Sequence, residues 1–480
     1  MDQLRDRRPR ASTIRSSSYW MVVGLTLPWA SCAASALESA AFPSREAPAP
    51  HLRGAASGLE HAAHGEHVDP VPDPRQGSAV SLGGMLAYAD LHSPLLRVAR
   101  TTRSRAEAAR VAAEVLLPDN PELTVAAGPR WGRAGTALEL EASLTQSFAL
   151  SGERAARLDA AARLRELTDA EIEQMRWAVH CDVHAAFHRV LVENERAALA
   201  ERVVAFQEDV LRVVQRQIAA GETPPLTLRL AEGEVAQARQ ELVLARQALL
   251  VSRLRLAQLS GWPSADPPSP GGAVDSPHDP PALARLLAVA RAHLPSLRTA
   301  AARVRETESR VDVAGREGWP LPSLGVQYRR EGNPSAEEAY DIVMGVLSLP
   351  VPLVQRGQGE RARAEADRAV ARAELEAEAR LLEARITEAR SEVLAAAGRT
   401  RAYGREILPR FEENLTLLRR SFELGEIDLL ALSTGRERFL RIQSDALAAQ
   451  LDYFVALAAL ERVVGIDLWR DDHHHGDTPR

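Results

Sequence analysis

The chain has 480 residues and a formal net charge of −6, so it has no general positive field of the kind that draws proteins to nucleic acid. It contains two cysteines, which excludes a disulfide framework. Aromatic residues make up only 4% of the chain, and the prevalence of alanine, leucine, arginine and glutamate favours long helices over a compact aromatic core.

A basic stretch followed by an apolar one predicts an export signal over residues 1–36. Arginines cluster between Arg5 and Arg15, and the apolar segment at 19–30 is too short to span a bilayer as a helix. The sequence offers two alternative processing sites. Ala-Ser-Ala at 34–36 is an ordinary cleavage site, whereas WASC, which ends at Cys32, resembles a bacterial lipobox with a tryptophan at its usual leucine position. Cys32 is therefore a candidate for lipidation.

Three further segments lack helix or strand periodicity. Residues 37–84 are rich in Ala, Pro, Gly and His and predict a flexible N-terminal segment. Residues 262–281 form a Pro/Gly linker, and residues 468–480 form a polar tail that contains His473, His474 and His475.

The body of the chain is predicted to be two copies of one unit, at 85–261 and 282–467. Similar motifs recur in the same order at a nearly constant offset. The pairs are the openings at His92 and His293, Gly152-Glu153-Arg154 and Gly359-Glu360-Arg361, Arg216-x4-Gly221 and Arg420-x4-Gly425, and the ends LAQLSG and ERVVG at Gly261 and Gly465.

Each unit is predicted to run helix, strand, strand, long helix, turn, helix. In the first unit these elements are a helix at 92–117, strands at 121–132 and 137–150, a long helix at 152–218, a turn at 219–225 and a return helix at 226–260. In the second unit the strands are at 322–331 and 340–353, the long helix at 358–423, the turn at 424–428 and the return helix at 429–463.

The long helices alone would be typical of a coiled-coil scaffold, because about 65 residues at 1.5 Å each extend roughly 100 Å. The strands indicate a membrane protein instead. Leu138, Leu140, Ala142 and Leu144 alternate with polar residues, as in a barrel with lipid outside and water inside. Val343, Gly345, Leu347 and Leu349 form a similar row, although the other face of that strand is also fairly apolar. Four strands cannot close a useful barrel, so several chains must contribute strands to it.

These features together resemble the TolC-type outer membrane efflux proteins. The resemblance rests on the export signal, the duplicated unit, the helix before each strand pair, the Gly-Glu-Arg exits, the Arg-x4-Gly turns and the terminal glycines. It implies a mainly α fold with membrane β: a homotrimeric, twelve-stranded outer membrane β-barrel that continues into a periplasmic α-helical coiled-coil tunnel. It further implies an adaptor (membrane fusion) protein and an inner-membrane pump as partners, a location in the outer membrane of a Gram-negative bacterium, and no cofactor.

The resemblance also assigns roles to the repeated motifs. Gly152, Gly357 and Gly359 would mark the crossings from barrel to tunnel. Arg216, Gly221, Arg420 and Gly425 would form the turns that contact the adaptor, although both arginines could instead be ordinary surface charges or form pairs within the protomer. The family often has acidic residues after the second turn. Ala431 and Thr434 occupy those positions here, which puts an acidic constriction in doubt.

Histidines are the candidates for specific chemistry, because no catalytic motif is present and an enzyme is not expected. His180, His184 and His188 recur every fourth residue on the first long helix, where neighbours can share a metal ion or simply pack in the helical wall. His473, His474 and His475 could bind metal or belong to a plain polar tail. These clusters favour heavy-metal cations as the substrate.

The sequence therefore predicts the outer membrane channel of a tripartite efflux system that works with a resistance-nodulation-division pump. One alternative is the channel of a type I secretion or organic-solute and drug export system. The other is an exported periplasmic coiled-coil scaffold or adaptor that never enters the membrane.

Overall fold

The computed structural model describes residues 79–132, 135–221, 224–272, 276–332 and 339–468. The predicted export signal, Cys32, most of the segment 37–84 and the tail histidines His473, His474 and His475 lie outside these ranges. Within them, none of the helices combines the length and apolar character needed to cross a bilayer.

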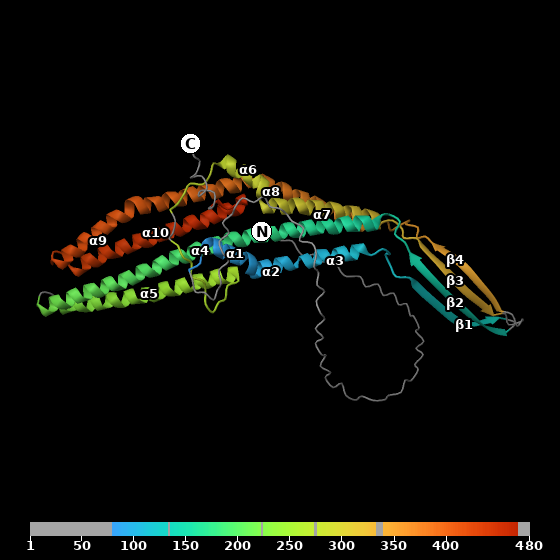
Figure 1. Cartoon of the computed structure of the whole chain (residues 1–480), viewed down its shortest axis with the longest axis horizontal. Helices are drawn as coiled ribbons and strands as arrows, with labels where there is room; N and C mark the ends of the chain where they lie inside the picture. Colours follow the sequence, from blue (N-terminus) through green and yellow to red (C-terminus); the bar gives the residue numbers. More distant parts are fainter. Residues whose placement is uncertain (1–78, 133–134, 222–223, 273–275, 333–338, 469–480) are drawn as a thin grey trace, which may run out of the picture. The chain divides into compact units, whose positions relative to one another are not determined.

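The two halves have the same order of elements (Figure 1). The first half contains α1 (Leu82–His92), α2 (Pro94–Thr101), α3 (Arg103–Glu114), β1 (Glu122–Gly132), β2 (Gly135–Ser147), α4 (Glu153–Ala219) and α5 (Pro225–Ser260). The second contains α6 (Leu283–His293), α7 (Pro295–Glu317), β3 (Ser323–Gly332), β4 (Ala339–Ser348), α8 (Gln358–Ala402), the π-helical turn η2 (Tyr403–Ile407), α9 (Leu408–Glu423) and α10 (Leu429–Val464).

Two helices predicted as continuous are divided in the structure. The helix expected at 92–117 is two helices, α2 and α3, which are divided at Thr102. A further helix, α1, precedes them and ends before Pro94, because Pro94 starts a new helix and cannot continue the old one. The helix expected at 358–423 is interrupted by η2, directly before Pro409 near the start of α9. Proline cannot donate to the carbonyl four residues earlier, and a π-turn accommodates that missing bond.

The four strands form one antiparallel sheet in the order β1-β2-β3-β4. The two predicted strand pairs are therefore joined along β2 and β3, where Leu144 lies opposite Val326. The sheet lies at one end of the helices in Figure 1, and the tips of α4–α5 and α9–α10 lie at the other.

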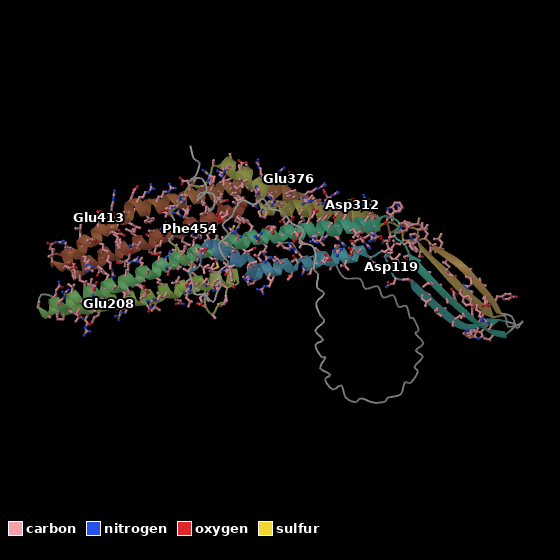
Figure 2. The ribbon with its side chains drawn as sticks, in the orientation of Figure 1. Asp119, Glu208, Asp312, Glu376, Glu413 and Phe454 are labelled. Carbon is pink, nitrogen blue, oxygen red and sulfur yellow. The ribbon has the colours of Figure 1, made fainter. Side chains whose placement is uncertain are left out.

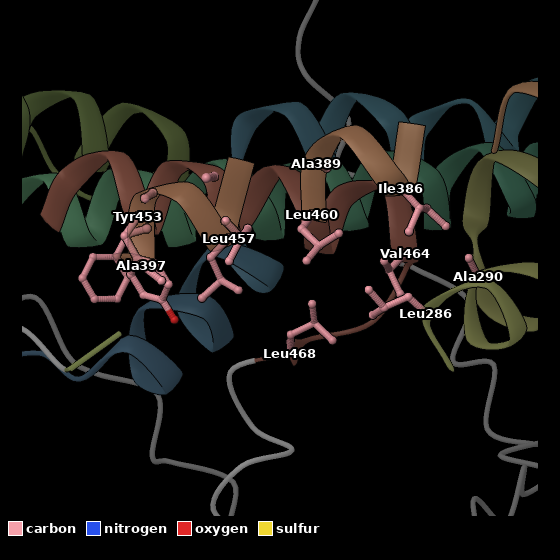
Figure 3. Close-up of a cluster of buried hydrophobic side chains, with 14 of the residues drawn as sticks. Leu286, Ala290, Ile386, Ala389, Ala397, Tyr453, Leu457, Leu460, Val464 and Leu468 are labelled. Carbon is pink, nitrogen blue, oxygen red and sulfur yellow. The ribbon is translucent and has the colours of Figure 1, made fainter. Parts of the chain in front are cut away.

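Three clusters of buried side chains hold the helices together. Matching clusters lie in the two halves, one where α1, α2 and α5 pack on α4, and one where α6 and α10 pack on α8 (Figure 3). The third joins the tips of the two helical hairpins through Val210, Val214, Phe422 and Leu432. Alanine, valine and leucine dominate all three, so the helices approach closely along their length.

Candidate functional site

The strand register separates apolar from polar side chains on the two faces of the sheet over β1, β2 and β3, whereas β4 is apolar on both faces. Leu123, Leu144 and Val326 lie opposite one another, and Leu324 lies opposite Leu347 on the same face. These five side chains are exposed. The next register row, on the other face, contains the polar residues Thr124, Ser143 and Gln327 on β1–β3 and ends with the apolar Met344 on β4. This is the alternation expected for a sheet with lipid on one side and water on the other.

Both edges of this sheet lack a partner strand within the described residues, because β1 pairs only with β2 and β4 only with β3. In lipid, open backbone donors and acceptors cost several kcal/mol each, so an open sheet is not stable there. The sheet of one chain is therefore an incomplete membrane element.

The crossings from sheet to long helix are made by two glycines with left-handed backbone. Gly152 (φ 72°) precedes α4 and Gly357 (φ 70°) precedes α8, and each is the N-cap of its helix. Gly359, also predicted at this crossing, lies within the first turn of α8 with nothing within 4 Å of an added Cβ. The equivalent positions are therefore Gly152 and Gly357, and the repeated Gly-Glu-Arg motif is offset from the structural repeat by two residues.

We expect Gly357→Ala to destabilise the protein by about 2 kcal/mol or more. An alanine there would adopt a left-handed backbone, which costs about 1–2 kcal/mol, and its Cβ would lie 2.9 Å from the Cα of Gly318. Gly359→Ala is the control, and we expect it to be neutral or stabilising by up to about 1 kcal/mol, as for glycine to alanine inside a helix. Thermal unfolding of the two purified variants tests this, and equal melting temperatures would contradict it.

The tip turns place two arginines and two glycines in similar surroundings. Gly221 (φ 78°) and Gly425 (φ 73°) allow the reversals, and an added Cβ at either would meet open space. Arg216 and Arg420 are exposed in the last turns of α4 and α9. Among the described residues neither guanidinium has a carboxylate within ion-pair distance, whereas nearby Arg212 pairs with Asp209 and Arg419 with Glu423.

A polar link joins the two helical hairpins behind the tips. Glu234 on α5 accepts hydrogen bonds from Arg436 on α10 (2.9 Å) and from Gln207 on α4 (2.9 Å). The Arg436 side chain is only 12% exposed, so this pair is better shielded from water than the surface pairs along the helices. Sequence reasoning missed this link, because its residues are far apart in the chain and match no motif.

His184 and His188 of α4 contact α10, whereas His180 lies beside Asp467 in the segment that follows α10. The His184 Nδ1 donates to Glu461 of α10 (2.7 Å). The His188 Nδ1 donates to the carbonyl oxygen of His184 (3.1 Å), and its ring stacks on Phe454, which Figure 2 labels on α10. His180 stacks on Trp177, with Nε2 3.6 Å from Asp467.

Glu461 is the central acceptor of this contact and is fully buried. Its second carboxylate oxygen accepts from the backbone N–H of Leu468 (3.0 Å), and its backbone carbonyl accepts from the Trp177 indole (3.2 Å). Burial opposes protonation of His184, but the hydrogen bond and the charges of Glu461 and Asp467 outweigh it and raise the pKa of His184 above its ordinary value. A lone glutamate in the apolar run VALAALERVVG was the available sequence signal.

The structure gives no support to a metal site on this stripe. His184 and His188 are buried in a packed helix contact, and burial raises the pKa of the neighbouring Cys181 thiol, which keeps it protonated. In the part of the chain that the structure covers, no group of three or more His, Cys, Asp or Glu side chains is placed to hold a metal ion.

We expect His188→Phe to make the protein less sensitive to acid. Burial and the nearby His184 lower the pKa of His188 from 6.5 to about 3. Between these values the unfolded chain binds a proton that the folded chain does not, so stability falls as pH falls through this window. Phenylalanine preserves the stack on Phe454 and cannot bind the proton. Melting temperatures between pH 7 and pH 4 should fall less steeply for the variant, and identical slopes would refute the assignment.

The family model of outer membrane efflux proteins matches the chain twice, over residues 86–262 and 286–466. These ranges correspond to the two structural halves. The cobalt-zinc-cadmium resistance protein CzcC of Cupriavidus metallidurans is 24% identical over 316 residues, which is 66% of this chain and 74% of that protein. The nickel-cobalt-cadmium resistance protein NccC of Alcaligenes xylosoxydans xylosoxydans is 26% identical over 230 residues, 45% of this chain and 48% of that protein.

The fold is similar to that of CusC, with a TM-score of 0.64 at 16% identity, over 80% of this chain and 92% of that chain. A membrane protein from Pseudomonas aeruginosa gives a TM-score of 0.63 at 20% identity, over the same shares of the two chains. At these identities the similarity shows a shared fold and carries no information on substrate.

Proposed function

Because the chain belongs to the outer membrane efflux protein family, we propose that it is the outer membrane channel of a tripartite efflux system for heavy-metal cations. Family membership places it in the outer membrane, as a channel-type protein rather than an enzyme. The exported scaffold that never enters the membrane, one of the alternatives from the sequence, is not consistent with this membership.

The open sheet is the observation that carries the channel assignment. One face is apolar and exposed, both edges lack partners among the described residues, and β2 and β4 lead through short segments into helices α4 and α8. Three copies that pair β1 of one chain with β4 of the next would close a barrel of twelve strands without an edge. The helices below it would then line a tunnel through the periplasm, with solute passing along the polar face of the sheet.

The metal substrate is supported by the relatives rather than by a binding site. CzcC and NccC are named for resistance to cobalt, zinc, nickel and cadmium, and CzcC matches two thirds of this chain. We infer that this chain works with a resistance-nodulation-division pump and a periplasmic adaptor to export divalent heavy metals. Selectivity would reside in the pump, so a channel without a dedicated metal site is consistent with this function.

Two measurements test the proposal. Purified full-length protein should form trimers in detergent and give single-channel currents in planar bilayers, and a monomer without conductance would refute the channel. A deletion strain should lose tolerance to cobalt, zinc, cadmium or nickel, and the intact gene should restore it. Unchanged tolerance to all four, with increased sensitivity to organic solutes, would favour the organic-solute alternative instead.

A further inference from the structure

The connections between the sheet and the helices expose a second apolar surface that is separate from the sheet. We call this surface the junction patch. It consists of six exposed side chains from the segments that follow β2, precede β3 and follow β4: Leu150, Trp319, Leu349, Val351, Leu353 and Val354. Each is more than half exposed, although none lies in a strand. Exposed apolar patches indicate a binding surface.

A cavity of about 800 Å³ opens within the junction patch. Leu150, Trp319 and Leu349 line it, together with Arg316 and Arg361. Among the described residues that line it, Asp312 is the one carboxylate, and Figure 2 shows Asp312 and Asp119 near the sheet end of the helices. The cavity therefore has an apolar wall toward the sheet and charged groups toward the helices.

Arg361 pairs with Glu365 on its own helix, but three other arginines near the junction patch donate to backbone carbonyls instead of carboxylates. Arg316 donates to the carbonyl of Ser151 (2.8 Å), Arg356 to that of Pro352 (3.1 Å) and Arg154 to that of Glu114 (3.2 Å). None of these three has a carboxylate partner among the described residues. A carbonyl fixes a guanidinium in place without neutralising it, and most of its five N–H donors remain available. Such a group is well suited to a phosphate.

The apolar rows of the sheet begin directly beside the junction patch. Leu324 and Leu347 form the first exposed pair of β3 and β4, and Leu349 follows two residues after Leu347. If the sheet spans the outer membrane, the junction patch lies at the level of the headgroups of the periplasmic leaflet. Tryptophan and arginine are the residues that favour this level, since each has an apolar body and a polar end.

We propose that the junction patch binds an anionic glycerophospholipid of the periplasmic leaflet. Its phosphate would be held by Arg316, which lines the cavity, and by Arg356, whose backbone carbonyl lies beside Gly318 at the end of α7. An acyl chain would lie along Leu150, Trp319 and Leu349 toward the sheet. This inference rests on the proposed membrane insertion of the sheet. It adds a specific lipid contact at the point where barrel and tunnel meet, where an ordered lipid would stabilise the crossings at Gly152 and Gly357.

Binding is tested by native mass spectrometry of the purified full-length protein with cardiolipin, phosphatidylcholine or inorganic phosphate. We expect cardiolipin to bind in preference to phosphatidylcholine, and Arg316→Gln/Arg356→Gln to weaken it about tenfold or more, since each arginine near an anionic surface contributes about 1 kcal/mol. The matched control is Arg363→Gln/Arg372→Gln, which changes two exposed arginines of α8 that pair with Glu360 and Glu308. Equal loss in both double variants, or displacement of cardiolipin by inorganic phosphate, would overturn the proposal.

Fluorescence gives a second measurement that does not depend on the arginine variants. In vesicles with brominated anionic lipid, the difference in emission between wild type and Trp319→Phe should be quenched, because Trp319 would contact the lipid. Bilayer conductance of the same wild-type preparation separates the two hypotheses. A conducting protein with an unquenched Trp319 refutes the lipid site alone, whereas a protein that does not insert refutes the proposed channel.

Discussion

Replacing Arg216 and Arg420 together with glutamate is expected to abolish metal tolerance in cells while leaving the protein folded in the outer membrane. Both side chains are exposed at the tips and have no carboxylate partner among the described residues, so the intraprotomer ion pairs that the sequence left open are not found there. Reversing two uncompensated charges costs little within the chain. The two introduced negative charges would weaken binding to a polar or acidic partner surface by several kcal/mol.

The matched control for this variant is Arg380→Glu, in the middle of α8. Arg380 is also exposed and pairs with Glu376 one turn away, so reversal there costs a few tenths of a kcal/mol. We expect it to preserve tolerance. The decisive measurements are tolerance of the deletion strain complemented with each variant, and co-purification of the cognate adaptor. Wild-type tolerance in the double variant would show that the tips do not contact the adaptor through these arginines.

The repeat made most of the fold predictable from sequence. Gly261 and Gly465 end α5 and α10 with left-handed backbone, as their equivalent positions suggested. The alternation of Leu138 to Leu144 predicted the two faces of the sheet because a strand has a strict period of two. Helix interruptions were harder to predict. One predicted helix is divided at Thr102 and the other just before Pro409, and the sequence pattern of apolar residues continues across both positions.

Contacts between the two halves could not be predicted in this way. The histidine spacing on α4 was visible in the sequence, but spacing along one helix does not say what lies opposite. The partner of His184 is Glu461, in the other half of the chain, where the equivalent position of the first half is Ala257. Such a difference between the two repeats marks a contact that has no equivalent elsewhere in the described part of the chain. It becomes interpretable only once the packing of α4 against α10 is known.

Glu461→Ala is expected to be the most destabilising single substitution at this contact, by about 3–5 kcal/mol. Glu461 is fully buried and accepts from His184 and from the backbone of Leu468, so its removal leaves a buried imidazole and a buried N–H without their acceptor. Glu437→Ala is the control on the same helix. Glu437 is exposed and pairs with Arg441, and we expect its loss to cost about 0.5 kcal/mol or less.

The pH dependence of the same variant tests the origin of the effect. The folded pKa of His184 lies above its unfolded value of 6.5, so the folded chain binds a proton that the unfolded chain releases as pH rises. The stabilisation is therefore complete below pH 6.5 and is lost as pH increases through the folded pKa. The difference in melting temperature between wild type and Glu461→Ala should be largest in mild acid and should shrink under alkaline conditions. A difference that grows with pH, or a Glu437→Ala variant that melts as early as Glu461→Ala, would show that the His184–Glu461 pair does not hold α4 to α10.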